Sequence, residues 1–90
     1  MKKLKPEFID GLTNFVYEQT GNLPKYWNII QSCINDLEAR ANHEDNGVVI
    51  TLMQDPENPK LFTLAYAHEI NLGGELYRIV AFADKDFIEV

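Results

Sequence analysis

Two stretches in the N-terminal half carry apolar residues at helical spacing. The first begins at Lys5-Pro6-Glu7, and its apolar residues recur every three or four positions: Leu4, Phe8, Ile9, Leu12, Phe15 and Val16. This spacing is typical of an amphipathic helix with one buried side. Thr20-Gly21 ends it, because glycine accepts the left-handed conformation that follows a helix. Gly11 falls inside the stretch, where a close approach of neighbouring backbone would explain a residue without a side chain.

The second stretch predicts a longer helix with a sharper division between polar and apolar sides. Asn22 is a suitable N-terminal cap, and Pro24 fits a first helical turn. The apolar side consists of Tyr26, Ile30, Cys33, Ile34, Leu37 and Ala41, with Trp27 at its border. Since the connection between the stretches is short, we expect the two helices to pack as an antiparallel pair.

The pattern changes to strands after Asn46-Gly47, a turn signal. Residues 48–53 form a continuous β-branched and apolar run, which predicts an inner strand. Residues 61–70 and 75–82 predict two further strands, joined by a two-residue turn at Gly73-Gly74. An extended loop with two prolines is expected at 55–59. A turn is expected at residues 83–86, and residues 87–90 are a candidate for a short edge strand.

The two-residue turn fixes the register of the predicted hairpin. Glu69 then faces Arg78, an opposite-charge pair, and this agreement favours the register because a slip by one residue would exchange every face. One face of the hairpin is bulky and should pack on the helices; it carries Phe62, Leu64, Tyr66, His68, Ile70, Tyr77, Ile79 and Ala81. The other face is flat and half apolar; it carries Thr63, Ala65, Ala67, Glu69, Arg78, Val80 and Phe82.

These elements predict a single α+β domain over residues 1–90. Two N-terminal amphipathic helices should pack on one face of a three- to four-stranded antiparallel sheet. Helices that both precede the sheet can cover only one of its faces. The second face should therefore be exposed, covered by the chain ends, or buried against a partner.

Charge and cysteine content narrow the choice of partners and compartment. Fourteen acidic and eight basic residues give a net charge of −6. Such a chain repels nucleic acid and anionic membranes and suits a basic protein partner. The single cysteine favours a reducing compartment, and no apolar run approaches the roughly 20 residues of a membrane span. No apolar signal core follows the basic N-terminus, so we expect a cytoplasmic protein.

The residues with potential chemistry form no specific motif. His68 and Glu69 are neighbours in a strand and point to opposite faces, so they cannot act together. His43-Glu44-Asp45 offers three metal ligands, but nothing upstream completes a set. Cys33 lies on an apolar helix side, which is unlike the electropositive, partly exposed setting of a reactive thiol. The sequence therefore predicts neither a cofactor nor a metal.

Two main classes of function follow from this pattern, and a small-ligand binder between helices and sheet is a third, for which a core this small leaves little room. The favoured one is a non-catalytic binding or regulatory protein whose partner is a basic protein or a second copy of the chain. An inhibitor, antitoxin or immunity-like protein is a sharper form of it, and so is an acidic mimic of nucleic acid. The alternative is a small hydrolase or nuclease-like enzyme that uses His68, Arg78, Glu69 or His43. The residues expected to bind the partner are Trp27, Ala65, Ala67, Glu69, Arg78, Val80 and Phe82.

Overall fold

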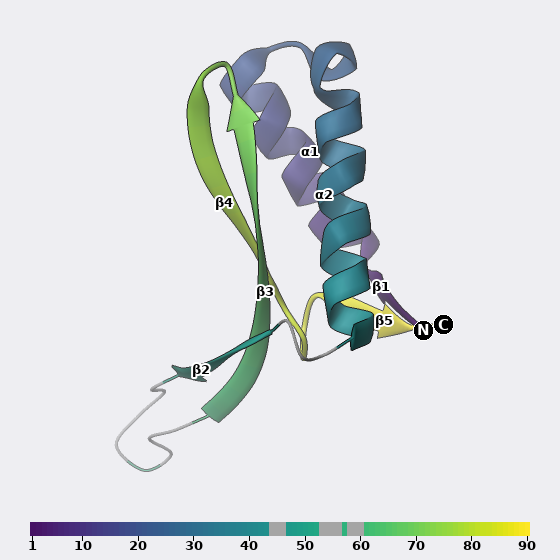
Figure 1. Cartoon of the computed structure of the whole chain (residues 1–90), viewed down its shortest axis with the longest axis vertical. Coiled ribbons are helices and arrows are strands. Elements are labelled where there is room, and N and C mark those ends of the chain that lie inside the picture. The colour runs from purple at the N-terminus through teal and green to yellow at the C-terminus, as the bar shows by residue number, and fades with distance from the viewer. Residues whose placement is uncertain (44–46, 53–56, 58–60) are drawn as a thin grey trace.

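Two helices and two antiparallel sheets make up the described part of the chain. The computed structural model describes residues 1–43, 47–52, 57 and 61–90. In chain order the elements are β1 (Lys2–Leu4), α1 (Pro6–Thr20), α2 (Leu23–His43), β2 (Val48–Leu52), β3 (Leu61–Leu72), β4 (Glu75–Phe82) and β5 (Phe87–Glu89). The α+β class with two N-terminal helices is confirmed (Figure 1). Most of the predicted 55–59 loop, and Asn46 of the predicted turn, lie outside the described residues.

The hairpin of β3 and β4 has the predicted register. Glu69 faces Arg78 and His68 faces Ile79, with Leu72 and Glu75 on either side of the turn. The two turn glycines have positive φ angles of 63° and 95°. This is the conformation that a two-residue turn requires and that side chains disfavour.

The sheet order is β2-β3-β4, so β3 is the central strand and β2 lies at an edge. The prediction of an inner strand at residues 48–53 is therefore wrong. Val48 and Val49 point to opposite faces and are 65% and 62% exposed. A run of β-branched residues indicates that the segment forms a strand. An inner position in the sheet also requires a neighbouring strand on each side, which such a run does not indicate.

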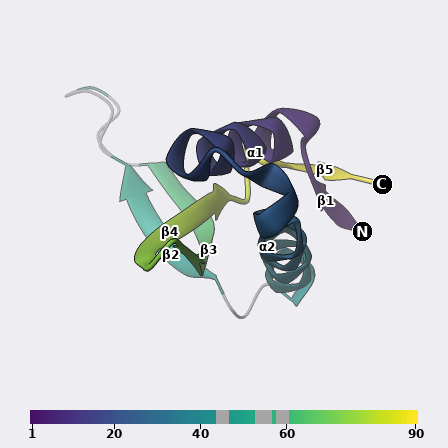
Figure 2. The ribbon, with the colours of Figure 1, turned by 90° about the horizontal axis from the view of Figure 1, so that it is seen from above.

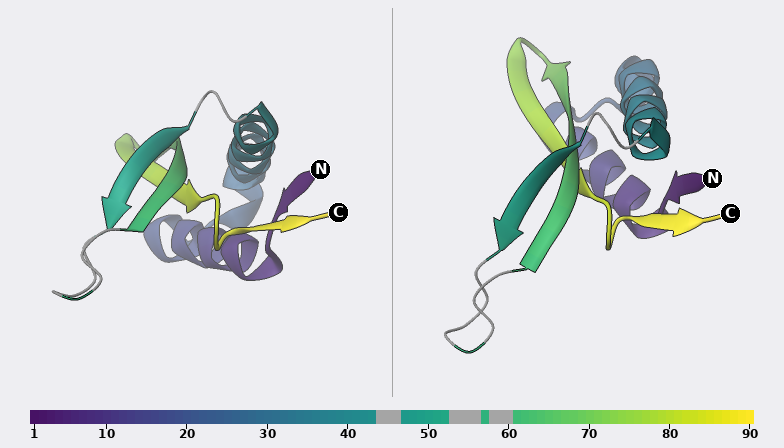
Figure 3. Two further views of the ribbon diagram at one scale, coloured as in Figure 1. Left: turned by 90° about the horizontal axis from the view of Figure 1, so that it is seen from below. Right: turned by 60° about the horizontal axis from the view of Figure 1, so that its bottom comes forward.

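A strand that the sequence did not predict opens the chain. Residues 2–4 form β1, which pairs antiparallel with β5 in a separate two-stranded sheet. Leu4 thus belongs to a strand and not to the first helical stripe, although it is buried. Lys5 stays extended, as expected of a residue before proline. The two ends of the chain consequently lie side by side (Figure 3).

Side chains of α2 occupy the outer edge of β1. The amide oxygen of Asn42 accepts a hydrogen bond from the backbone N–H of Lys2 at 2.8 Å, and its NH2 group donates to the Lys2 carbonyl. A carboxylate oxygen of Glu38 accepts from the N–H of Leu4 at 2.9 Å. The main sheet lies on one side of the helices and the β1–β5 pair on the other (Figure 2).

Both helix boundaries follow the predicted signals. Gly21 has a φ of 65° and its N–H donates to the Tyr17 carbonyl at 2.7 Å, which ends α1. The side-chain oxygen of Asn22 accepts from the N–H of Lys25 and caps α2. Gly11 does not serve a close backbone approach, because an added Cβ would meet no atom within 4 Å. Neither helix is long and apolar enough to cross a membrane, as far as the described residues go.

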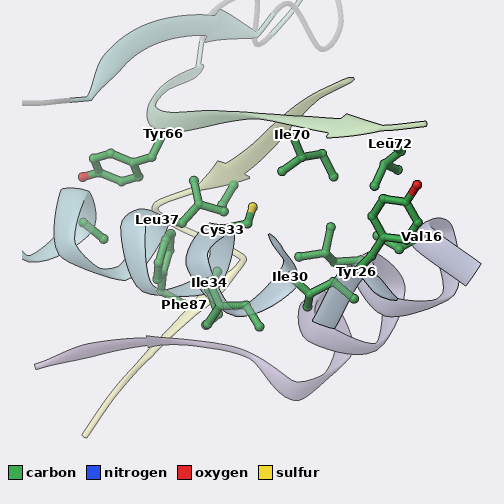
Figure 4. Close-up of a cluster of buried hydrophobic side chains, with 14 residues drawn as sticks. Val16, Tyr26, Ile30, Cys33, Ile34, Leu37, Tyr66, Ile70, Leu72 and Phe87 are labelled. Carbon is green, nitrogen blue, oxygen red and sulfur yellow. The ribbon is translucent and has the colours of Figure 1, made fainter. Parts of the chain in front are cut away.

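The core lies between α2 and one face of the β3–β4 hairpin, the front face (Figure 4). The buried residues of α2 are those of the predicted apolar side. On the sheet they meet Tyr66, Ile70 and Leu72, which alternate along β3 and so point to the same face. The ring of Tyr66 also contacts that of Phe87 edge to face, with centroids 5.8 Å apart.

The Tyr66 hydroxyl is buried and has no hydrogen-bond partner among the described residues. Its ring lies close to Gly47, where an added Cβ would come within 2.8 Å of the ring atom Cε1. The Tyr66 ring thus occupies the space that a side chain at position 47 would need. The hydroxyl, in contrast, is buried without a hydrogen bond to compensate for the water it has lost.

We expect Tyr66→Phe to leave the free energy of unfolding unchanged or to raise it by about 1–2 kcal/mol, because the substitution removes an unsatisfied buried hydroxyl. Gly47→Ala should lower the free energy of unfolding by about 1–3 kcal/mol through steric strain against the ring. Urea denaturation of the two variants measures both effects. A loss of stability in Tyr66→Phe would show that the hydroxyl is hydrogen-bonded in solution.

Candidate functional site

The back face of the sheet is the face that turns away from the core, and it carries most of the predicted partner-binding residues. Ala67, Glu69 and Arg78 are exposed there, while Val80 and Phe82 are half-buried. Ala65 is only 5% exposed. It is flanked by Val48 of β2 and Phe82 of β4, whose larger side chains shield its methyl group. Ala65 therefore offers a partner little surface.

Trp27 is exposed, as expected of a contact residue, but the structure does not bring it to the back face. It follows Tyr26 on α2, and the buried side of α2 packs against the front face. Trp27 and the back-face residues thus lie on opposite sides of the sheet. A partner that contacted both would have to wrap around the edge of the molecule.

The candidate catalytic residues are dispersed. Glu69 and Arg78 form an exposed ion pair at 3.6 Å on the back face, while His68 points to the front. His43 is exposed at the end of α2, and Glu44 and Asp45 lie outside the described residues. Within the described part of the chain no three His, Cys, Asp or Glu side chains lie close enough to hold a metal ion.

Asp36 joins α2 to β3 through His68. One oxygen of its carboxylate, Oδ2, lies 2.7 Å from Nδ1 of His68 and accepts a hydrogen bond from Nε of Arg40, also at 2.7 Å. The spacing of Asp36 and Arg40 on the helix was visible in the sequence, as an i,i+4 pair of opposite charge. The His68 contact spans 32 residues and had no local signal.

The two partners change the protonation of Asp36. Burial by itself would raise the pKa of this carboxyl, but hydrogen bonds and positive charge from Arg40 and His68 outweigh it. The pKa of Asp36 is therefore held below its usual value. The carboxylate is charged at neutral pH and can orient the imidazole ring, which is the role of the acidic residue in many catalytic sites.

Cys33 cannot supply a nucleophile to this group. Burial, assisted by the negative charge of Asp36, raises the pKa of its thiol to about 11. The side chain is fully buried in the core. At neutral pH it remains an uncharged thiol without access to a substrate, in agreement with the prediction that it acts as a small apolar residue.

A shallow depression of about 320 Å³ lies beside His68. Its lining includes Ser32 and Asn28 of α2 and Asn71 of β3. Ser32 contributes a hydroxyl to this lining and Glu69 a carboxylate. Among the described residues no hydrogen bond joins the Ser32 hydroxyl to His68. The depression thus contains an oriented histidine and polar neighbours, without an activated nucleophile.

We expect Asp36→Asn to lower the free energy of unfolding at neutral pH by about 1 kcal/mol, a value reduced by solvent screening. The pKa of Asp36 in the folded state lies below its unfolded value of about 3.9. The charged carboxylate therefore contributes its full stabilisation at pH values above about 3.9. It is lost as the pH falls through the folded-state pKa. Urea denaturation at a series of pH values should show the difference between wild type and variant shrinking in acid. Asp10→Asn, on the exposed side of α1, is the control, and a difference independent of pH would contradict the assignment.

The structure thus brings His68 to an orienting carboxylate and keeps the other candidate residues away from His68. Glu69 and Arg78 bind each other on the back face, and His43 lies at the far end of α2. The larger feature is the back face itself, where exposed apolar and charged residues lie together on the β3–β4 hairpin. Comparison with models of known protein families, with curated proteins and with solved structures finds no match to this chain.

Proposed function

We propose that this chain is a non-catalytic binding or regulatory module that acts by contacting a protein partner. The observation that carries the proposal is the open back face. The buried core lies against the front face, while Val48 and Leu76 on the back face are 65% and 66% exposed. Ala67 is exposed between them, and Val80 and Phe82 are half-buried. Apolar groups gathered on an exposed face are a mark of interaction surfaces.

The net charge of −6 favours a basic partner, and a second copy of the chain is the other candidate. An inhibitor, antitoxin or immunity-like role is the form of this proposal in which the partner is a basic enzyme. The single, buried Cys33 supports a reducing compartment such as the cytoplasm. We do not extend the proposal to a mimic of nucleic acid, because several carboxylates it would use have internal partners: Asp36, Glu38, Asp86 and Glu89.

A photo-crosslinking side chain in place of Ala67 tests the proposal, with the same group in place of the exposed Tyr17 on α1 as control. In cells that express the full chain, we expect position 67 to yield a discrete adduct that position 17 does not. An adduct of twice the chain mass would identify a second copy as the partner, and another mass a different protein. Equal or absent adducts at the two positions would contradict a partner on the back face.

The hydrogen bond between His68 and Asp36 favours one alternative, a small hydrolase with His68 as general base. In that case His68→Ala should lower the hydrolysis of p-nitrophenyl acetate or RNA by about 100-fold or more. His43→Ala, far from the pair, should leave it unchanged. No hydrolysis by the wild-type chain above buffer, or undiminished hydrolysis in the His43→Ala/His68→Ala double variant, would eliminate the alternative.

A further inference from the structure

The outer edge of β4 presents backbone groups without partners. Phe82 shows which way they point, because its N–H donates to a carboxylate oxygen of Asp86 at 2.7 Å and its carbonyl accepts from the Asp86 N–H at 2.9 Å. Both groups of Phe82 thus face away from β3. In an antiparallel pair this orientation recurs at every second residue. The N–H and C=O groups of Leu76, Arg78 and Val80 therefore also face outward.

Side chains cover two other stretches of strand edge in this chain. Asn42 and Glu38 bind the outer edge of β1, and Asp86 binds that of β4 at Phe82. At Arg78 and Val80 no described residue provides such a bond. An exposed row of unpaired backbone groups is a template for pairing with another strand.

An apolar groove of about 390 Å³ runs beside these unpaired groups. Its wall on α1 consists of Glu7, Phe8, Gly11, Leu12 and Phe15, and its wall on β4 consists of residues 78–80. Because successive strand residues point to opposite faces, a groove that touches three in a row must follow the edge of the strand. Gly11 borders the open space of the groove, since an added Cβ there would meet no atom within 4 Å.

The contacts between α1 and β4 hold the groove in shape. The rings of Phe15 and Tyr77 meet edge to face with centroids 5.1 Å apart. The Tyr77 hydroxyl donates to the side-chain oxygen of Gln19 at 3.2 Å. These contacts attach the second half of α1 to the start of β4, and the groove extends from there along residues 7–15 of the helix.

We propose that this groove binds an extended segment of a partner protein, which adds to the outer edge of β4 as a fourth strand of the main sheet. The inference rests on the proposed binding function and assigns it a site. Arg78 is 69% exposed, and its ion pair with Glu69 is long at 3.6 Å. An acidic residue opposite Arg78 on the added strand would complete a row of alternating charge across three strands.

The neighbours of that acidic residue point to the other face of the sheet, toward Phe8, Leu12 and Phe15. The bound segment should therefore have the sequence pattern apolar, acidic, apolar.

A second copy of the chain fits the site less well. Symmetric pairing of residues 76–80 with themselves would place Arg78 opposite Arg78, a repulsive pair. It would also bring the α1 helices of both copies to the same edge.

Amide hydrogen exchange in the free, full-length chain gives the first test. The amides of Arg78 and Val80 should exchange rapidly, because they point outward. Those of Tyr77 and Ile79, which point to β3, should be protected. Slow exchange at Arg78 and Val80 would show that the edge is already occupied and would overturn the inference.

Selection from a random heptapeptide library displayed on phage gives the second test. We expect enriched peptides to carry the apolar, acidic, apolar pattern and to shift the amide resonances of residues 76–80 and 8–15. Their affinity should fall by about tenfold or more in Gly11→Leu, which fills the groove, and in Arg78→Glu. Gly11→Ala, which adds one methyl group to the same helix position, is the matched control and should bind like wild type. Thermal unfolding checks that all three variants fold.

Methylation of single backbone nitrogens in an enriched peptide separates strand addition from apolar contact alone. Methylation at the residue opposite Arg78 should abolish binding, because that N–H donates to the Arg78 carbonyl. Methylation at the next residue, whose N–H points away, should be tolerated. The inference is overturned if methylation has the same effect at both positions, or if the peptides bind Gly11→Leu as tightly as wild type. It is also overturned if peptide binding shifts only the amide resonances of residues 48–50, or if the library yields no enriched peptide. If Ala67 still yields its adduct in those cases, the proposed function stands without this site.

Discussion

β5 pairs with β1 across nearly the whole length of the chain, with Lys3 opposite Ile88, and this pairing withdraws β5 from the main sheet. Without it, β5 could have followed β4 as a fourth strand and covered its outer edge. Instead the chain turns away after Phe82, where Asp86 takes the backbone groups that a neighbouring strand would have bound. The main sheet is therefore left with three strands and with an open edge at β4.

α2 connects the two sheets. One side of the helix carries Ile30, Cys33 and Leu37 into the core against β3. Another side carries Glu38 and Asn42 to the edge of β1. Removing α2 would expose apolar surface on the main sheet and unpaired backbone groups on β1. The small sheet is thus tied to the helix by hydrogen bonds, and its Leu4 and Phe87 are buried in the same core. The helices thus cover the middle of the front face, where Tyr66 and Ile70 are buried.

Rules that act over a few residues predicted most of the fold. The buried side of α2, its Asn22 cap and the register around Gly73-Gly74 all follow from spacing along the chain, and all are confirmed. What the sequence did not predict depends on residues far apart. β1 has only three residues, too few for an alternating pattern, and its partner lies at the other end of the chain. The contact of Asp36 with His68 and the edge position of β2 likewise depend on which elements meet in space.

The open edge of β4 and the back face form one continuous surface. Arg78 and Val80 belong to both: their side chains lie on the back face, and their backbone groups face the groove beside α1. A strand added at this edge would extend the back face by one row. A single strand of a few residues buries less than the roughly 800 Å² per partner of a stable interface. A partner that inserts a strand beside α1 and rests the adjoining surface on Ala67 and Leu76 would use both features, and the two together can supply the area that neither supplies alone.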